Sequence, residues 1–234
     1  MFNSGVFSEK NVAEALDMLV NDFPLAIWET LYVTVLATLF AIIIGLPLGV
    51  LLVVGEKNGV MPMPKWLMST LNVIINILRS VPFIILMILV MPVTRLIVGT
   101  AVGTEASIVP LTVAAFPFIA RLVEGSLREI NPNIIEAAQS MGASPFQIIA
   151  KVMIPESMPS LLSNATIAFT TIIGYTAMSG VVGGGGLGMI AYNYGYSRYK
   201  TLIMIIAVII LVIIVQVIQS LGTRISVKSD KRIK

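Results

Sequence analysis

The sequence predicts an all-α membrane protein with five transmembrane helices, its N-terminus outside the cell and its C-terminus in the cytosol. Of the 234 residues, 57% are hydrophobic and only 12% are charged, whereas an ordinary soluble domain carries about 25% charged residues. The mean hydropathy is +0.96. Five apolar stretches are also long enough to cross a bilayer, which takes about 20 residues. The excess apolar surface must therefore face lipid.

The five predicted spans cover residues 31–54, 67–93, 106–127, 161–182 and 202–221. The first has no charged residue, and the last is interrupted only by Gln216 and Gln219. No charge occurs between Glu156 and Arg198, a stretch too long for one helix, and glycine dominates residues 183–188. We therefore expect a fourth span followed by an irregular glycine-rich segment.

The distribution of Lys and Arg sets the predicted orientation, because cytosolic loops carry an excess of positive residues. With the N-terminus outside, four positive residues are exterior and ten are interior. The exterior ones are Lys10, Arg95, Arg198 and Lys200. The interior ones are Lys57, Lys65, Arg121, Arg128, Lys151, Arg224, Lys228, Lys231, Arg232 and Lys234.

Two short segments flank the predicted transmembrane domain. Residues 1–24 hold one Lys and no long apolar run, which argues against a signal peptide. Their apolar residues fall near helical spacing, so we expect either an amphipathic helix at the membrane interface or a short helix without a special role. Residues 223–234 form a basic cytosolic tail, which attraction to anionic lipid explains.

The composition also excludes several common kinds of catalytic and metal-binding site. Without His or Cys, the chain has no Ser-His-Asp triad, no HExxH metal site and no thiolate nucleophile. Its net charge of +3 is small and scattered, which argues against nucleic-acid binding. The glycine run lacks the Lys and Ser or Thr of a phosphate loop. We expect no enzyme, no cofactor and no metal on this chain.

One predicted cytosolic loop, residues 128–158, is long enough to have a function of its own, because unstructured loops above about 15 residues are uncommon. It contains residues that typically begin and end helices. Residues 131–133 offer an N-cap, and Glu136 follows Asn133 by three residues, the spacing of a capping box. The predicted helix 134–141 ends at Gly142. A second helix begins at Ser144-Pro145 and is expected to stop before Pro155.

The residues of this loop resemble the EAA motif of membrane subunits of ATP-binding-cassette importers, written EAA-x3-G-x9-I-x-L-P. The residues that carry the resemblance are Glu136, Ala137, Ala138, Gly142, Ile154 and Pro155. Two positions depart conservatively from the motif: Val152 stands for its Ile, and Ile154 stands for its Leu. The resemblance implies the fold of a type I importer transmembrane domain over residues 25–222. It also implies that the first helix of the loop docks on a cytosolic ATPase.

Three further stretches are similar to the methionine-importer permease subfamily: residues 79–86 (RSVPFIIL), residues 183–188 and the tyrosine-rich residues 192–196. This similarity implies translocation of methionine across the cytoplasmic membrane by alternating access, and it leaves the D and L forms open. The implied partners are two copies of the ATPase, which hold ATP and Mg²⁺, a second copy of the chain, and an extracytoplasmic methionine-binding lipoprotein. Membrane lipid surrounds the assembly.

Candidate residues for the solute path or gate lie at the end of the fourth span: Tyr175, Met178, Ser179, Gly184 and Gly186. Irregular backbone at membrane depth must be buried in protein or line an aqueous cavity. The small and hydroxyl residues of this span could equally serve helix packing. Arg79, a charge inside span two, is either functional or structural. We favour the structural role, in which it reaches the cytosolic interface or pairs with Glu124, Glu129 or Glu136.

Alternative functions remain open at this stage. A permease for another amino acid or small solute of the same superfamily would differ in substrate binding. A passive channel or ion-coupled carrier would transport without ATP and would be expected to carry central acidic residues in its spans.

Overall fold

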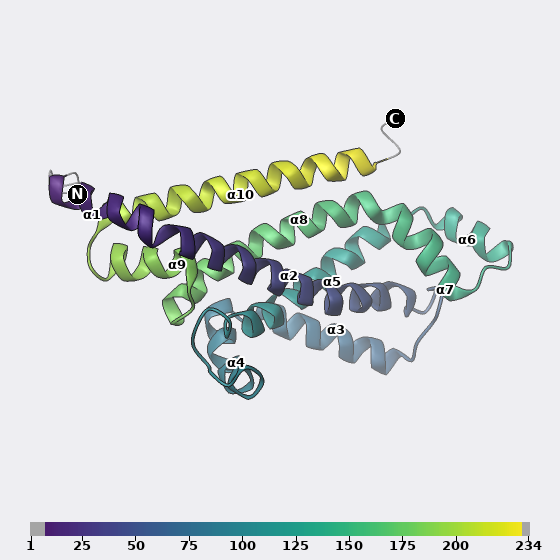
Figure 1. Cartoon of the computed structure of the whole chain (residues 1–234). Coiled ribbons are helices and arrows are strands. Elements are labelled where there is room, and N and C mark those ends of the chain that lie inside the picture. The colour runs from purple at the N-terminus through teal and green to yellow at the C-terminus, as the bar shows by residue number, and fades with distance from the viewer. Residues whose placement is uncertain (1–7, 231–234) are drawn as a thin grey trace. The chain divides into compact units, whose positions relative to one another are not determined.

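The computed structural model describes residues 8–230, and within that range every regular element is a helix (Figure 1). The long helices are α2 (Phe23–Val54), α5 (Ile108–Arg128), α8 (Ile154–Ser179) and α10 (Thr201–Ser229). Shorter ones are α1 (Glu9–Asn21), α3 (Lys65–Ser80), α4 (Phe83–Val98), α6 (Pro132–Ser140), α7 (Pro145–Ile148) and α9 (Gly186–Ile190). The tail residues Lys231, Arg232 and Lys234, and residues 1–7 of the N-terminal segment, lie outside the described range.

The predicted number of spans agrees with the helices. Within the described residues, four helices are long and apolar enough to cross a membrane, and the bent pair α3 and α4 can supply a fifth span. The span predicted over residues 67–93 consists of two helices, α3 and α4, because the chain breaks at Ser80–Pro82. Proline lacks a backbone N–H and disfavours helical geometry in the residue before it. Val81 accordingly has extended backbone (φ −79°, ψ 127°).

At position 155, in contrast to position 82, proline does not interrupt the helix. We expected the second helix of the cytosolic loop to stop before Pro155, and this is wrong: helical structure continues from Pro145 to Val182. A π-helical turn, Ile149–Met153, precedes the proline. The N–H of Ile154 donates to the carbonyl of Ile149, five residues back instead of four. Such local π geometry accommodates a proline whose missing N–H would otherwise break the helix.

The described chain forms two compact units, the first comprising residues up to Thr38, Pro82–Thr112 and Phe169–Ile218. Its apolar core brings the N-terminal helix together with later elements: Ala15, Met18, Phe23, Ala26, Leu187, Ile190, Ile203 and Ala207. One side of α1 is thus packed in protein, whereas Leu16 and Val20 are exposed. Part of the apolar surface of α1 is therefore covered by protein, and its place at a membrane interface stays a prediction.

The second unit comprises Leu39–Val81, Val113–Ala168 and the chain after Gln219. Here α2 and α5 approach closely because glycines replace side chains at the contact. A Cβ atom on Gly49 would lie 2.5 Å from the carbonyl oxygen of Ala120. Near the same contact, Leu52, Met68, Ile75 and Ala120 form a buried cluster. Small residues at helix interfaces are typical of membrane proteins.

Candidate coupling site and solute path

The loop predicted over residues 128–158 contains a helical hairpin, made by α6 and α7. Helix α6 starts at Pro132, two residues earlier than predicted, because Asn131 is the N-cap: its side chain accepts a hydrogen bond from the N–H of Asn133 at 3.0 Å. Pro132 takes the first helical position, where its missing N–H costs nothing. The helix ends as predicted at Gly142, which has φ +79°. This left-handed backbone reverses the chain without a side-chain clash.

The second half of the hairpin begins with a complete capping box. The N–H of Gln147 donates to the Ser144 hydroxyl at 3.4 Å, and the Gln147 side chain accepts from the Ser144 N–H at 2.9 Å. Helix α7 then runs through the π-helical turn into α8. The hairpin is therefore joined to a long helix without an intervening loop.

The EAA-motif residues divide between the surface and the interior of the hairpin. Glu136 and Ala137 are exposed, and Ala138 is buried. Glu136 lines a cavity of about 350 Å³ together with Arg128 and Met153. Ile154 lines a different, apolar cavity of about 190 Å³, and Pro155 is exposed. The first two residues of the motif thus lie on the surface of the hairpin, and Ala138 lies in its interior.

Two large apolar side chains stand out from the hairpin. Met141 at the end of α6 is 80% exposed, and Phe146 in α7 is 77% exposed. Exposed apolar groups on an otherwise polar projection are typical of interaction sites. The sequence analysis missed both residues, although their place beside Gly142 and Pro145 is a usable signal.

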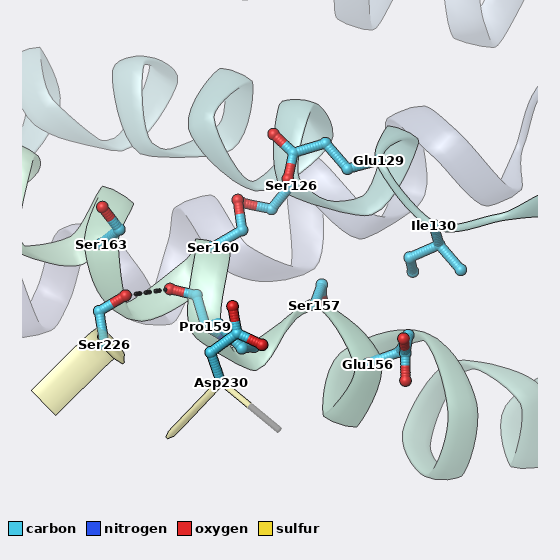
Figure 2. A pocket seen from close by; sticks show the side chains of 10 residues that line it. All are labelled: Ser126, Glu129, Ile130, Glu156, Ser157, Pro159, Ser160, Ser163, Ser226 and Asp230. Carbon is cyan, nitrogen blue, oxygen red and sulfur yellow. Dashed lines mark hydrogen bonds between the residues drawn. The ribbon is translucent and has the colours of Figure 1, made fainter. Parts of the chain in front are cut away.

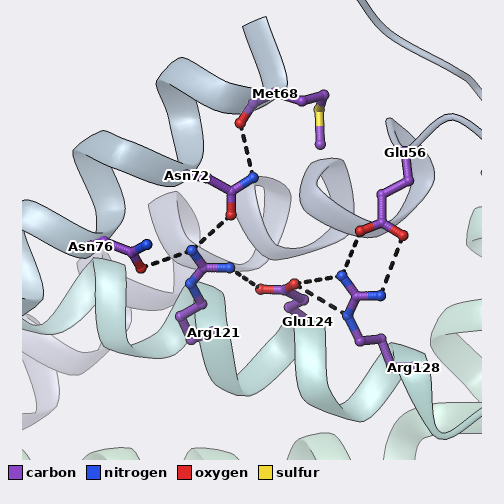
Figure 3. A network of polar contacts seen from close by, with 7 residues as sticks. All are labelled: Glu56, Met68, Asn72, Asn76, Arg121, Glu124 and Arg128. Carbon is purple, nitrogen blue, oxygen red and sulfur yellow. Dashed lines mark hydrogen bonds and ion pairs between the residues drawn. The ribbon is translucent and has the colours of Figure 1, made fainter. Parts of the chain in front are cut away.

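A charged network joins the end of α5 to α3 and to the connection after α2 (Figure 3). Glu124 pairs with Arg121 at 2.6 Å and with Arg128 at 2.8 Å, and Arg128 also pairs with Glu56 at 2.6 Å. Arg121 further donates to Asn72 and Asn76 of α3 at 2.8 and 2.9 Å. The Glu124 carboxylate thus pairs with two arginines of its own helix. These arginines in turn join α5 to α3 and to Glu56 in the connection after α2.

Arg79 takes no part in this network. Its predicted pairing with Glu124 is wrong, since Arg121 and Arg128 occupy that carboxylate. Within the described part of the chain, no ion pair includes Arg79, whose side chain is exposed in the last turn of α3. A structural role for Arg79 in bracing the hairpin has no support in these contacts.

A polar cavity of about 300 Å³ lies between the ends of α5, α8 and α10 (Figure 2). Its lining is rich in hydroxyl and carboxylate groups: Ser126, Glu129, Glu156, Ser157, Ser160, Ser163, Ser226 and Asp230. The Ser226 hydroxyl donates to the Pro159 carbonyl at 2.8 Å. Asn164 donates to the Ser126 hydroxyl at 2.8 Å. Polar residues of α8 on this side therefore serve helix packing.

The candidate path residues fall into two groups. Tyr175 is half-buried and stacks on Phe83, with ring centroids 4.7 Å apart, and Met178 is 45% exposed. Ser179 and Gly184 are buried together, and the N–H of Gly184 donates to the Ser179 carbonyl at 2.9 Å. Gly186 is also buried. Only Tyr175 and Met178 have side-chain surface that a solute could touch in this structure.

The glycine run is fixed by residues that the sequence analysis did not single out. The Glu29 carboxylate accepts the N–H of Gly186 at 2.7 Å and the Thr104 hydroxyl at 3.0 Å. The Thr30 hydroxyl accepts the N–H of Leu187 at 2.9 Å. A Cβ atom on Gly185 would lie 2.1 Å from the Thr104 hydroxyl oxygen. The glycines are therefore needed for close packing.

Comparison with known proteins gives a consistent set of relatives. The family model described as binding-protein-dependent transport system inner membrane component matches residues 41–226. A probable D-methionine transport system permease protein of Vibrio cholerae is 48% identical over 208 residues, covering 88% of this chain and 92% of that protein. The D-methionine transport system permease protein of Escherichia coli K12 is 51% identical over 154 residues, covering 66% and 70%.

Solved structures have the same fold. A chain from an inward-facing conformation of the MetNI methionine ABC transporter has a TM-score of 0.86 and 48% identity, covering 88% of this chain and 95% of that one. A chain of an amino acid ABC transporter, only 18% identical, has a TM-score of 0.72 over 87% of this chain and 92% of that one. With a family model over most of its length and relatives about half identical, the chain belongs to the inner membrane components of binding-protein-dependent transport systems.

Proposed function

We propose that this chain is the permease subunit of an ATP-driven importer that carries methionine across the cytoplasmic membrane. The α6–α7 hairpin is the structural observation that carries the proposal, because it offers an exposed docking surface continuous with a long membrane helix. Relatives named for D-methionine transport, at 48–51% identity, support the choice of substrate. Both the D and the L form are proposed substrates.

The hairpin is the proposed contact with a cytosolic ATPase. Glu136 and Ala137 lie on its surface, and Met141 and Phe146 provide apolar anchors of the kind that dominate binding energy at interfaces. ATP and Mg²⁺ bind to the ATPase in this proposal, because this chain has no phosphate-loop sequence. One ATPase binds to each of two permease copies.

The proposed transport unit is a homodimer, with the N-terminus of each chain outside and the C-terminus in the cytosol. Residues 25–222 form the transport domain, and residues 1–24 and 223–234 flank it. Five spans are few to enclose a solute path within one chain, so in this proposal the path lies between the two copies. An extracytoplasmic methionine-binding lipoprotein delivers the solute, and the ATPases drive alternating access by moving the hairpins.

Residues near the end of α8 contribute to this path. Tyr175 and Met178 have the exposed surface to contact solute, and Ser179, Gly184 and Gly186 form the packed wall behind them. In this role the glycine run supports the outer gate.

Uptake of labelled methionine tests the proposal. The chain is expressed with its ATPase and binding protein in a host that lacks its own methionine importer. We expect ATP-dependent uptake of L- and D-methionine that disappears without the ATPase. Competition by other amino acids in excess identifies the alternative substrates. Uptake that persists without ATP would contradict the proposal, and so would competition by another amino acid at lower concentration than methionine.

A further inference from the structure

One side of α3 carries polar side chains among its apolar residues. Ser69, Asn72, Asn76, Arg79 and Ser80 follow one another at helical intervals. At about 100° of rotation per residue, these five positions fall on one side of the helix. We call them the α3 polar stripe.

The α3 polar stripe lies on the outside of the single chain. Four of its members are exposed, and Asn72 is half-buried. The buried contacts of α3 are made by Met68 and Ile75, on a neighbouring side of the helix. The stripe is therefore available to water, lipid or another molecule.

Lipid is a poor environment for the stripe, because polar groups in hydrocarbon cost several kcal/mol each. Helix α3 belongs to a pair, bent by 111°, that is apolar enough to form a broken membrane span or a re-entrant loop. Trp66, 70% exposed at its start, is the kind of residue that marks a membrane interface. Arg79 follows 13 residues later, about 20 Å along the helix, whereas the hydrocarbon core is about 30 Å thick. Arg79 therefore lies at membrane depth and needs an aqueous surrounding.

Arg79 also lacks a counter-ion within the chain. Among the described residues, no carboxylate forms an ion pair with it. A guanidinium stays protonated even when it is desolvated. Charged residues inside membrane spans usually face a water-filled cavity and take part in function. A full positive charge at this depth is best satisfied by an anion that enters with water.

The rest of the stripe is held in place beside Arg79. Arg121 donates to the side-chain oxygens of Asn72 and Asn76, which fixes both amides from behind. Ser80 donates to the Asn76 carbonyl of its own helix at 2.7 Å. The Arg79 guanidinium is left to bind a ligand, and its planar shape matches a carboxylate.

We propose that the α3 polar stripe lines the aqueous solute path and that Arg79 binds the carboxylate of the amino acid as it passes. This inference rests on the proposed function and deepens it by naming a substrate contact. Direct packing of the stripe against its own copy is disfavoured, because a twofold axis would bring two like charges together. Water and an anionic solute between the copies remove that repulsion.

The absence of cysteine allows a direct test. Single variants Ser69→Cys and Ser80→Cys are treated in membrane vesicles, with the ATPase present, with a small membrane-impermeant maleimide. Ile74→Cys is the matched control, because Ile74 is 47% exposed on the opposite side of α3. We expect the two stripe positions to react about tenfold faster than Ile74→Cys, as water access requires. Equal rates on both sides, or no reaction at the stripe, would overturn the path assignment.

Protection from labelling tests the carboxylate contact. Methionine should slow the labelling of Ser80→Cys several-fold, and methioninamide, which has no carboxylate, should not. Adding Arg79→Gln should abolish this protection without abolishing labelling, and Arg79→Lys should retain part of it. Equal protection by the two compounds, or protection that survives Arg79→Gln, would refute binding at Arg79. The contrast between the two sides of α3 needs no methionine transport, so failure of the uptake experiment is distinguishable.

Discussion

Glu29 and Gly186 are 157 residues apart in sequence, yet the Glu29 carboxylate accepts the Gly186 backbone N–H at 2.7 Å. The same carboxylate accepts the Thr104 hydroxyl at 3.0 Å. One side chain near the start of α2 therefore holds two other segments together: the connection before α5 and the glycine run.

Removal of this carboxylate should destabilise the first unit. Glu29→Ala leaves a partly buried N–H without its acceptor, which typically costs about 1–3 kcal/mol. Glu29→Gln keeps an acceptor oxygen and should reduce the stability less than Glu29→Ala does. The midpoint of thermal unfolding of the purified protein in detergent measures both effects. Glu105→Ala, at an exposed position beside Thr104, is the control; an equal loss in that variant would contradict a specific role for Glu29.

Within the charged network, substitution of Glu124 should reduce the stability of the protein most. Its side chain is only 11% exposed between Arg121 and Arg128, so Glu124→Ala leaves two guanidiniums without a shared partner. Arg128 keeps its pair with Glu56, and Arg121 keeps its hydrogen bonds to α3, so the expected cost in unfolding free energy is about 1–3 kcal/mol.

Glu56 provides the comparison within the same network. Its side chain is 47% exposed, and exposed ion pairs contribute about 0–1 kcal/mol. Thermal unfolding of both variants under the same conditions should show a larger loss of stability for Glu124→Ala than for Glu56→Ala. A larger shift for Glu56→Ala would show that the network is not centred on Glu124.

Two glycine-to-alanine substitutions should change the stability of the protein in opposite directions. In Gly49→Ala the new methyl group would lie 2.5 Å from the Ala120 carbonyl oxygen, so α2 and α5 must separate at a cost of about 1–3 kcal/mol. In Gly125→Ala the methyl group meets nothing within 4 Å, and alanine favours the helix by about 1 kcal/mol. Unfolding midpoints of the two variants check the signs; a stabilised Gly49→Ala would refute the close helix contact.

Backbone geometry, more than space, should limit substitution at Gly142. Its φ is +79°, and a Cβ atom there would meet nothing within 4 Å. Gly142→Val is strained by about 1–3 kcal/mol in this left-handed region, and it should reduce ATP-driven uptake several-fold while the amount in the membrane stays unchanged. Gly142→Asn tolerates the same backbone and should transport better. Equal uptake by the two variants would argue against a conformational requirement at this turn.

The sequence predicted those parts of the fold that depend on local pattern. Apolar run length located the spans, and Gly142 and Ser144-Pro145 located the turn and second helix of the hairpin, because caps and stops are decided by neighbouring residues. The break at Pro82 was not predicted, and the continuation through Pro155 was misjudged. The same residue type ends a helix at one site and is absorbed by a π-helical turn at the other.

Contacts between distant segments could not be predicted from one sequence. Nothing in the pattern around Glu29 points to Gly186, and Glu124 was assigned to the wrong arginine. The α3 polar stripe has a local signal, the spacing of Ser69, Asn72, Asn76 and Arg79. Average hydropathy hides that signal, because apolar residues occupy the other sides of the helix.

The π-helical turn at Ile149–Met153 has a mechanical consequence. Because helical structure continues from Pro145 into α8, no loop separates α7 from the start of α8. A displacement of α7 would therefore pass to the first turns of α8 through backbone hydrogen bonds, without a flexible connection in which the movement could be lost.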